Sequence, residues 1–497
     1  MDISGSSAMS GDARVFQATA VGTFEKEARE YRTRRQELWD RNAAGLDKSW
    51  GGYYRKYLRR VYATLIPKGA TILELGCGRG DLLASLEPSR GIGVDFSREM
   101  LAQAKSRYPE LEFKVGDVHS DLGMECQQFD YIILSDLVND LWDVQAVLEN
   151  IQPLCHPGTR IICNFHSHLW GVPLKLARKL GVATPNLVQN WLTPHDMDNL
   201  FDISGFESLR TWQEILVPFQ VPGLAELCNK YLVKVTPFRF LGLANFMMAR
   251  VKPRKRKSEP TVSVIVAARN EAGHIEELME RIPEMGGGTE IVFVEGNSSD
   301  DTYETIERVI SEDPNRNCIL LKQPGKGKGD AVRCGFAAAK GDILMILDAD
   351  ITVPPEDLPR FFNVIASGEG EFVNGVRLVY PMDEDAMRFA NLLGNKFFSW
   401  AFSWLLGQPI RDTLCGTKVL WADDYKRIVG NRSYFGDFDP FGDFDLLFGA
   451  AKLNLKIKEV PIRYRARRYG DTNIDRWRHG ALLLRMVAFA AHRLKFV

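Results

Sequence analysis

The chain has 497 residues, of which 45% are hydrophobic, and a formal net charge of −1. This length supports two to three globular domains, and the near-zero charge argues against a general affinity for nucleic acid. The eight cysteines are scattered and lack Cys-x-x-Cys spacing. We therefore expect reduced thiols in a cytoplasm, without a disulfide framework.

The chain begins with an extension, residues 1–53, that precedes the first recognisable strand pattern. Its first 20 residues lack the basic-then-apolar pattern of a signal peptide. We expect this first part to be disordered.

The first glycine-rich turn follows a short apolar strand, Thr71–Leu75, and runs from Gly76 to Asp81. Its spacing is Gly-x-Gly-x-Gly, whereas the dinucleotide fingerprint requires Gly-x-Gly-x-x-Gly, so NAD is the weaker interpretation. A second strand, 91–94, ends on Asp95, where an acidic side chain can accept the hydroxyls of a ribose. Further strands are predicted at 113–115, 129–134 and 160–164.

This order of motifs resembles the class I S-adenosylmethionine-dependent methyltransferases over residues 54–251. The resemblance implies that S-adenosyl-L-methionine is the cofactor and that seven residues contact it. Glu74, Gly76, Gly78 and Gly80 would surround its methionine part, Asp95 its ribose, and Asp117 and Val118 its adenine. The methyl acceptor is not indicated; His119, His166, His168 and His195 are each a possible base or a structural histidine. A cofactor-binding scaffold without turnover is the alternative.

A second glycine-rich segment, 325–350, combines Lys326 and Lys328 with an apolar strand, 343–347, that ends on Asp348 and Asp350. Open α/β sheets bind ligands at the carboxyl ends of their strands. Hard divalent ions are held there by one or two carboxylates together with substrate phosphates. The segment therefore predicts a metal-assisted phosphate site.

Strands at 261–268 and 290–294 alternate with helices around this site, and the segment 261–475 resembles glycosyltransferase family 2, which has the GT-A fold. The resemblance implies a nucleotide sugar (GDP- or UDP-hexose) and Mg²⁺ or Mn²⁺ held by Asp348 and Asp350. The implied donor contacts are Arg269, Asn270, Glu271, Glu295, Lys328, Arg333 and Asp348. The family's acidic pair after the second strand is Glu295-Gly296 here, so only its first carboxylate matches.

Three later blocks, 411–418, 442–445 and 459–474, resemble the acceptor side of polyprenyl-phosphate glycosyltransferases. They imply a polyprenyl phosphate acceptor, with Asp412 and Asp445 as catalytic candidates that could equally be structural. An ionised phosphate needs cations more than a base. Four arginines could supply them: Arg377, Arg411, Arg467 and Arg468.

The chain from Lys452 to its end carries twelve lysines and arginines against three acidic residues. We expect a basic amphipathic helix over 476–497, lying on an anionic membrane surface. The aromatic run Phe389–Leu406 is interrupted by Gly394, Asn395 and Lys396, so we expect it to lie on the membrane and not to span it. Amphipathic core helices are the alternative for both segments.

The predicted fold class is therefore α/β, with two Rossmann-like domains separated by a basic linker, 252–260. The predicted protein is a bifunctional enzyme that is cytoplasmic and peripheral at the inner face of the membrane. It would combine a methyltransferase with a metal-dependent, inverting hexosyltransferase. One alternative is a family 2 enzyme that acts on a soluble or growing glycan, with the N-terminal domain as a scaffold. Another is a nucleotidyltransferase.

Overall fold

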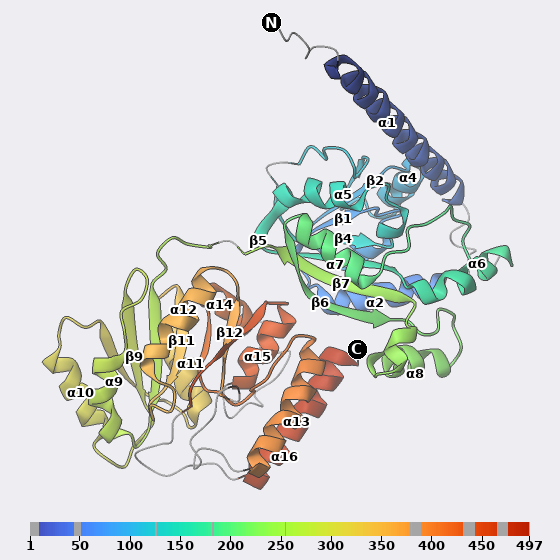
Figure 1. Cartoon of the computed structure of the whole chain (residues 1–497). Helices are drawn as coiled ribbons and strands as arrows, with labels where there is room; N and C mark the ends of the chain where they lie inside the picture. Colours follow the sequence, from blue (N-terminus) through green and yellow to red (C-terminus); the bar gives the residue numbers. More distant parts are fainter. Residues whose placement is uncertain are drawn as a thin grey trace, which may run out of the picture. The chain divides into compact units, whose positions relative to one another are not determined.

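The computed structural model describes residues 9–43, 51–124, 127–180, 183–253, 255–377, 379, 389–430, 443–464 and 476–496, with side chains from residue 25 on, except for 389–393, 395, 443 and 476–482. The chain divides into two compact units, Met1–Lys252 and Pro253–Val497, called unit 1 and unit 2 below (Figure 1). Each unit is built on one seven-stranded sheet. The predicted α/β class, with one such sheet in each half of the chain, is confirmed.

The sheet of unit 1 has the order β3-β2-β1-β4-β5-β7-β6. β1 through β5 run parallel, and β7 is antiparallel to both β5 and β6. The strand order reverses between β1 and β4, which is the kind of switch point at which open α/β sheets bind ligands. The strands are β1 Thr71–Leu75, β2 Arg90–Asp95, β3 Glu112–Val115, β4 Phe129–Ser135, β5 Cys155–His166, β6 Phe206–Glu214 and β7 Ala244–Val251.

Helices cover the two faces of this sheet, and each face has its own apolar cluster. The strands are buried on both sides because their alternate side chains enter different clusters, as with Leu73 in one and Ile72 in the other. The helices are α1 Met9–Asn42, α2 Gly52–Leu65, α3 Asp81–Ser85, α4 Arg98–Arg107, α5 Val144–Ile151, α6 Gly171–Lys179, α7 Pro194–Ile203 and α8 Leu224–Lys230.

The N-terminal extension differs from the expectation of disorder, because α1 begins at Met9 and is 34 residues long. The segment lacks proline and is rich in alanine, glutamate and arginine, which lose little side-chain freedom in a helix. Its last turns are held on unit 1 by polar contacts: Gln36 Nε2 donates to Phe96 O at 3.0 Å, and Asp40 accepts from Ser97 Oγ at 2.5 Å.

The sheet of unit 2 has the order β10-β9-β8-β11-β13-β12-β14, with β13 antiparallel between β11 and β12. The strands are β8 Val262–Ala268, β9 Thr289–Glu295, β10 Cys318–Lys322, β11 Ile343–Asp348, β12 Phe372–Val376, β13 Lys418–Trp421 and β14 Ile457–Pro461. The helices are α9 Ile275–Arg281, α10 Thr302–Glu312, α11 Lys328–Ala338, α12 Leu358–Ala366, α13 Phe389–Leu406, α14 Ala422–Gly430, α15 Asp443–Lys452 and α16 Arg476–Ala490.

The two helices expected to lie on a membrane, α13 and α16, pack against each other (Figure 1). Phe402 and Leu405 of α13 and Met486 of α16 are buried in one apolar cluster of unit 2. One face of each helix therefore belongs to the core, and only the opposite face is available to a membrane. In the described part of the chain, no helix combines the length and the apolar character that a bilayer crossing requires.

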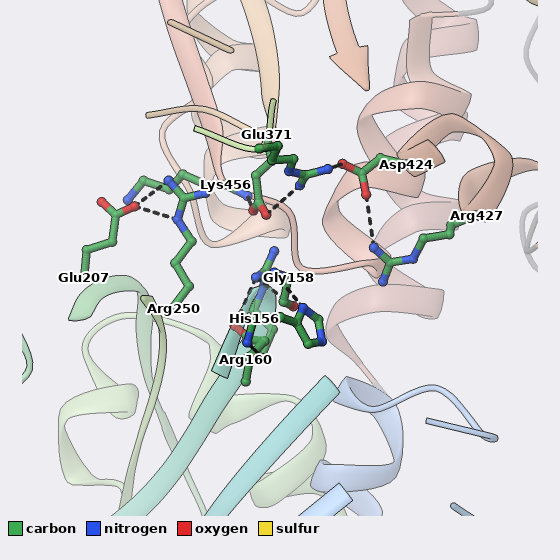
Figure 2. A network of polar contacts seen from close by, with 11 residues as sticks. His156, Gly158, Arg160, Glu207, Arg250, Glu371, Asp424, Arg427 and Lys456 are labelled. Carbon is green, nitrogen blue, oxygen red and sulfur yellow. Dashed lines mark hydrogen bonds and ion pairs between the residues drawn. The ribbon is translucent and has the colours of Figure 1, made fainter. Parts of the chain in front are cut away.

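The predicted linker is tied to unit 2 from residue 256 on. Arg256 pairs with Asp424 at 2.8 Å and with Glu371 at 3.1 Å, and Lys257 pairs with Asp342 at 2.6 Å. Figure 2 shows Asp424 also accepting from Arg427, and Glu371 accepting from the backbone of Lys456. Arg256 and Lys257 thus anchor the segment that leads into the first strand of unit 2.

Candidate active sites

The first site begins with the glycine turn after β1. Gly76, Gly78 and Gly80 all have positive φ, at +69°, +51° and +73°, which a side chain would disfavour. A Cβ on Gly76 would lie 2.8 Å from Leu137, whereas a Cβ on Gly78 would meet nothing within 4 Å. The turn therefore leaves a backbone surface open for the close approach of a ligand. This is the geometry that a bound cofactor requires.

Asp95 lies at the end of β2 beside this turn. Its carboxylate accepts from Gly78 N and from Ser97 N, both at 2.8 Å. A carboxylate has about four acceptor positions, so Asp95 retains capacity to accept from a ribose hydroxyl. Burial raises the pKa of Asp95, and it also raises the pKa of Glu74, which accepts from Leu83 N. The residues present fit a cofactor of the expected kind.

A cavity of about 1010 Å³ opens above these residues. Six of the seven predicted cofactor residues line it; these are Glu74, Gly76, Gly78, Asp95, Asp117 and Val118. Gly80 is not part of the lining, and a Cβ on it would lie 2.6 Å from Phe113. The lack of a side chain at Gly80 therefore allows the start of α3 to approach β3. The volume lies at the upper end of ligand sites, so a cofactor and an acceptor can share the cavity.

Asp117 forms an ion pair with a residue of α1, which the sequence did not indicate. Arg32 of α1 donates to Asp117 Oδ2 at 2.6 Å, and His119 donates to Oδ1 through its backbone N–H at 3.0 Å. Burial acts to raise the pKa of Asp117, but the hydrogen bonds from His119 outweigh it and hold the pKa at about 2. The helix α1 thus closes one side of the cavity through a residue predicted to flank the adenine.

Of the four candidate histidines, His166 and His119 line the cavity. His168 lies outside the lining and is hydrogen-bonded to Trp191 O at 2.6 Å, and His195 is also absent from it. Among the described residues, Nδ1 of His166 is buried without a hydrogen-bond partner. Burial lowers the pKa of His166, which keeps the ring neutral and able to accept a proton.

Asp136, which the sequence analysis left without a role, lies beside His166 at the end of β4. It accepts from Tyr54 OH at 2.8 Å and from Asn164 Nδ2 at 2.5 Å, and its φ is +54°. A left-handed aspartate at a strand end is a strained position of the kind that concentrates at functional sites. Its only sequence signal was its place directly after β4.

The second site lies at the carboxyl ends of β8, β9 and β11. Glu271 is buried and its Oε2 is 2.8 Å from His274 Nδ1, while Glu295 accepts from Ser298 N at 2.5 Å. Asn270 has φ +56° and accepts from Ser299 N at 2.8 Å. Arg269 and Asn270 are exposed beside them. The structure thus brings together four of the predicted nucleotide-sugar contacts, with hydrogen bonds fixing three of them.

The centre of the second site is the contact between the phosphate loop and the end of β11. Lys328 Nζ lies 2.5 Å from Asp348 Oδ1. A Cβ on Gly416, from the predicted acceptor loop, would lie 2.0 Å from Asp348 Oδ2 and 2.5 Å from Lys328 Nζ. Burial acts to raise the pKa of Asp348, but the Lys328 ammonium outweighs it and lowers that pKa. The predicted donor loop and acceptor loop therefore meet at one carboxylate.

The second carboxylate of the pair, Asp350, is oriented by the residue two positions on. Its Oδ1 accepts from Thr352 N at 3.2 Å and from Thr352 Oγ1 at 2.7 Å. Its Oδ2 has no hydrogen-bond partner among the described residues. Two hard oxygen donors, one of them an ionised Asp348, suit Mg²⁺ or Mn²⁺, which also draws on substrate phosphates. In the described ranges no group of three His, Cys, Asp or Glu side chains forms a metal cluster.

Two residues assigned to separate acceptor roles form a pair. Arg377 donates through Nε to Asp412 Oδ2 at 2.7 Å and through Nη2 to Oδ1 at 2.8 Å. Asp412 also accepts from the backbone N–H groups of Arg377 and Leu414. Burial acts to raise the pKa of Asp412, but Arg377 outweighs it and lowers that pKa. This network favours a positioning role for Asp412 over that of a base.

The remaining predicted residues are less closely placed. Arg333 lies one turn into α11, where its guanidinium is 4.0 Å from the carboxylate of Asp330. Arg411 is exposed, and its backbone N–H donates to Glu459 at 2.6 Å. Asp445 is half-buried in the first turn of α15. Arg467 and Arg468 lie outside the described residues.

The structure adds Lys418 to the second site. Its side chain is fully buried, and Nζ donates to Cys415 O at 2.5 Å. Its charge also lowers the pKa of Asp348. The sequence signal was the lysine at the end of the acceptor block, which lies on a strand that is otherwise apolar.

Comparison with known proteins finds a family match in each unit. Residues 66–205 match a methyltransferase domain family, and residues 263–425 match glycosyl transferase family 2. The low-salt glycan biosynthesis hexosyltransferase Agl6 of Haloferax volcanii is 28% identical over 233 residues, covering 45% of this chain and 53% of that protein. The dolichol-phosphate mannosyltransferase of Pyrococcus furiosus is 37% identical over 109 residues, covering 22% and 30%. The chain thus spans about half or less of the length of these two relatives.

Solved structures resemble each unit separately. A glucosyl-3-phosphoglycerate synthase from Mycobacterium tuberculosis, in complex with Mn²⁺, UDP-glucose and phosphoglyceric acid, is 20% identical with a TM-score of 0.36. It covers 47% of this chain and 80% of that one. An S-adenosylmethionine-dependent methyltransferase from Thermotoga maritima is 16% identical with a TM-score of 0.35, covering 44% and 99%.

Proposed function

We propose a reaction for each half of this transferase, whose chain joins a methyltransferase domain to a domain of glycosyl transferase family 2. Unit 2 would transfer a hexose from a nucleotide sugar to a polyprenyl phosphate, with inversion at the sugar. Unit 1 would transfer a methyl group from S-adenosylmethionine to a second acceptor. The observation that carries the first proposal is the meeting of Lys328, Asp348 and Gly416.

In unit 2, the cationic loop would bind the diphosphate of the donor. Lys328 lies on the first turn of α11, so its ammonium and the helix N-terminus both favour negative charge there. Asp348 and Asp350 would hold a divalent cation, which supplies Lewis-acid stabilisation of the departing nucleoside diphosphate. Lys328, now paired with Asp348, would turn toward the diphosphate when the donor binds.

The acceptor would approach from the loop that contains Gly416. Any side chain at that position would collide with Asp348, so the loop backbone borders the donor site. Arg377, oriented by Asp412, supplies a guanidinium at the same edge of the sheet. An ionised phosphate acceptor needs such cations and little help from a base. Curated relatives named dolichol-phosphate mannosyltransferase support a polyprenyl phosphate as this acceptor.

In unit 1, the cofactor would lie on the glycine turn with its ribose on Asp95, and S-adenosylmethionine supplies an activated methyl group with a good leaving group. The protein's own part is then to position the acceptor. His166, which lines the cavity with its Nδ1 buried and its ring neutral, would hold or accept a proton of the acceptor at Nδ1. Asp136, held by Tyr54 and Asn164, lies beside it.

We propose that both reactions take place at the cytoplasmic face of a membrane. In unit 2, Phe397 and Trp400 of α13 are 48% and 67% exposed, while the opposite face of that helix is in the core. Leu484 of α16, the helix that packs on α13, is 52% exposed. Aromatic side chains in a basic setting are typical of a membrane-lying surface.

A ligand screen tests the proposal. We expect GDP- or UDP-hexoses to raise the melting temperature of the whole chain only when Mn²⁺ or Mg²⁺ is present. S-adenosylmethionine should raise it independently, since a ligand at a hundred times its Kd stabilises the folded state by about 2.7 kcal/mol. Radiolabelled hexose should then enter the detergent-extractable lipid fraction. Transfer into a water-soluble product would instead support the soluble-acceptor alternative, and release of pyrophosphate a nucleotidyltransferase.

A further inference from the structure

Exposed apolar side chains are concentrated in two segments of unit 1. Among the described residues, 21 large apolar side chains are exposed, and 13 of them fall within 169–180 and 219–241. A globular surface spreads such residues singly, and large apolar patches mark interaction surfaces. The two segments, called the apolar rim below, contribute Leu169, Val172, Leu176, Leu180, Phe219, Val221, Leu224, Leu227, Tyr231, Val235, Phe238, Phe240 and Leu241.

The two segments of the apolar rim meet at the mouth of the cavity in unit 1. Trp170 Nε1 donates to Leu241 O at 2.9 Å, which ties the start of the first segment to the end of the second. Trp170, Leu174 and Phe219 also line the cavity. In Figure 1, α6 and α8, which carry much of the rim, lie toward the same end of unit 1. The cavity that would hold the cofactor therefore opens beside apolar side chains.

The charge of the apolar rim indicates which kind of surface it binds. The segments 169–180 and 219–241 contain one acidic residue, Glu226, and six lysines and arginines, which are Lys175, Arg178, Lys179, Lys230, Lys234 and Arg239. Lys234 pairs with the buried Glu214, which leaves five cations for the rim. Arg239 lies over the ring of Phe240 at 4.8 Å. Helices with lysine and arginine among large apolar side chains are typical of membrane surfaces. Lysine is depleted in interfaces between proteins, which makes a second copy of the chain a poorer occupant.

Two arginines and two carboxylates lie around His166 in the interior of the cavity. Arg35, only 5% exposed, lies 3.9 Å from Asp140, and among the described residues its Nε has no hydrogen-bond partner. Arg178 of the rim also lines the cavity, and Asp140 again is the carboxylate that acts on it. Burial lowers the pKa of both arginines. Arg35 and Arg178 share Asp140 as their carboxylate, because Asp136 is held by Tyr54 and Asn164, so guanidinium donors remain available for an anionic ligand.

We propose that the apolar rim of unit 1 docks on an anionic bilayer, so that the cavity receives a methyl acceptor carried by a lipid with a phosphate or carboxylate group. The rim inserts its apolar side chains, its cations contact the lipid headgroups, and Arg35 and Arg178 hold the anionic group of the acceptor. The acceptor part rests on the proposed methyltransferase function. The docking part does not.

Vesicle binding tests the docking. The full chain is sedimented with vesicles of phosphatidylcholine alone or with 30% phosphatidylglycerol, as wild type and as the double variant V172E/L176E. Both side chains are more than half exposed, so the fold should persist. Ile203→Glu, at an exposed apolar position outside the rim, is the matched control. We expect at least a tenfold loss of partitioning to anionic vesicles for the double variant and less than a twofold change for the control.

A second measurement distinguishes membrane binding by the apolar rim from membrane binding by unit 2. Brominated lipids quench tryptophans that lie at the bilayer, so Trp170→Phe should remove part of the quenching in the wild-type chain. Equal quenching in W170F and wild type, or equal partitioning of V172E/L176E and I203E, would overturn the docking. A dimer in sedimentation velocity that V172E/L176E dissociates would also overturn it, because a second copy would then cover the rim.

The anionic acceptor has its own test without vesicles. Hexyl phosphate should bind the wild-type chain at least tenfold more tightly than Arg178→Gln in calorimetry, while Arg34→Gln, on the exposed side of α1, should bind like wild type. Equal binding to wild type and R178Q would overturn this part. S-adenosylmethionine binding is measured in parallel: its absence in wild type would refute the methyltransferase proposal and leave the vesicle result standing.

Discussion

Arg377 and Asp412 form a bidentate ion pair, with donor–acceptor distances of 2.7 and 2.8 Å, in which Asp412 is fully buried. Their sequence positions suggested two independent roles, a cation for the acceptor phosphate and a catalytic base. The pair makes one role depend on the other, because Asp412 fixes the orientation of the guanidinium. Asn374 Nδ2, which donates to Asp412 O at 2.7 Å, ties the same loop to β12.

Asp412→Asn should destabilise unit 2 by about 3–5 kcal/mol, since it leaves the Arg377 charge buried without its partner. Urea unfolding followed by tryptophan fluorescence would measure this change. Asp357→Asn is the control, because its pair with Arg360 is exposed and such pairs contribute about 0–1 kcal/mol. If D412N unfolds like wild type but loses all sugar transfer, Asp412 acts in the chemistry and the positioning role is wrong.

Asp350→Asn should abolish sugar transfer and metal-dependent donor binding, because Asp350 is one of the two carboxylates proposed to hold the cation. Binding of S-adenosylmethionine to the same variant should be unchanged, which serves as an internal control for folding. Calorimetry with a nucleotide sugar, with and without Mn²⁺, checks the first expectation. Full activity of D350N, or of wild type in excess chelator, is the result that contradicts the metal assignment.

Asp95→Ala should weaken S-adenosylmethionine binding by about 1.5–3 kcal/mol, the range for hydrogen bonds to a charged group. The substitution removes the acceptor for a ribose and also the cap on Gly78 N and Ser97 N. Glu110→Ala, an exposed acidic residue of the same unit, is the comparison and should bind normally. Unchanged affinity in D95A would refute the placement of the ribose, and tight NAD binding would refute the cofactor.

The elements that the sequence predicted well are those with strong local signals. Short apolar runs that end on glycine or aspartate, such as those before Gly76 and Asp348, became β1 and β11 at nearly the expected residues. Side chains buried on both faces of a parallel sheet must be apolar, so these strands are visible without knowledge of their neighbours. In each of the two sheets, the residues at the carboxyl ends of the parallel strands then lie together at one edge.

What the sequence could not indicate are contacts between residues far apart in the chain. Arg32 and Asp117 are 85 positions apart, and Arg377 and Asp412 are 35 apart. No local pattern distinguishes such a partner from a solvated charge. The apolar rim was also missed, because α6 and α8 are ordinary amphipathic segments by periodicity, and only their exposure in the folded unit distinguishes them from core helices.

Acid should loosen α1 from the cavity of unit 1. The pKa of Asp117 is held at about 2 in the folded protein, below the value of about 3.9 for an unfolded aspartate. A depressed pKa contributes stability that is present above about pH 4 and is lost as the pH falls toward 2. Hydrogen exchange of residues 25–43 should therefore accelerate over this window in wild type.

The variant Asp117→Asn isolates this contribution. It should exchange faster than wild type at pH 5 and change less between pH 4 and 2, because its side chain cannot titrate. Asp121→Asn, at an exposed carboxylate a few residues on, should follow wild type throughout. If D117N and wild type show the same pH profile, the Arg32–Asp117 contact does not hold α1 in place.

The exposed face of α13 gives the test of membrane attachment by unit 2. Deleting residues 477–497 would be a poor test, because Leu483, Met486 and Ala490 of α16 are buried in the core cluster that α13 shares. Phe397→Asp with Trp400→Asp changes only exposed side chains of α13. We expect less of this variant to sediment with anionic vesicles than of wild type. The fraction of the variant that still binds should be released by salt, since surface charges are screened over about 8 Å at physiological ionic strength. Val429→Asp, at an exposed position of α14, should bind like wild type. A chain that stays wholly in solution with anionic vesicles at low salt would make a polyprenyl phosphate acceptor untenable.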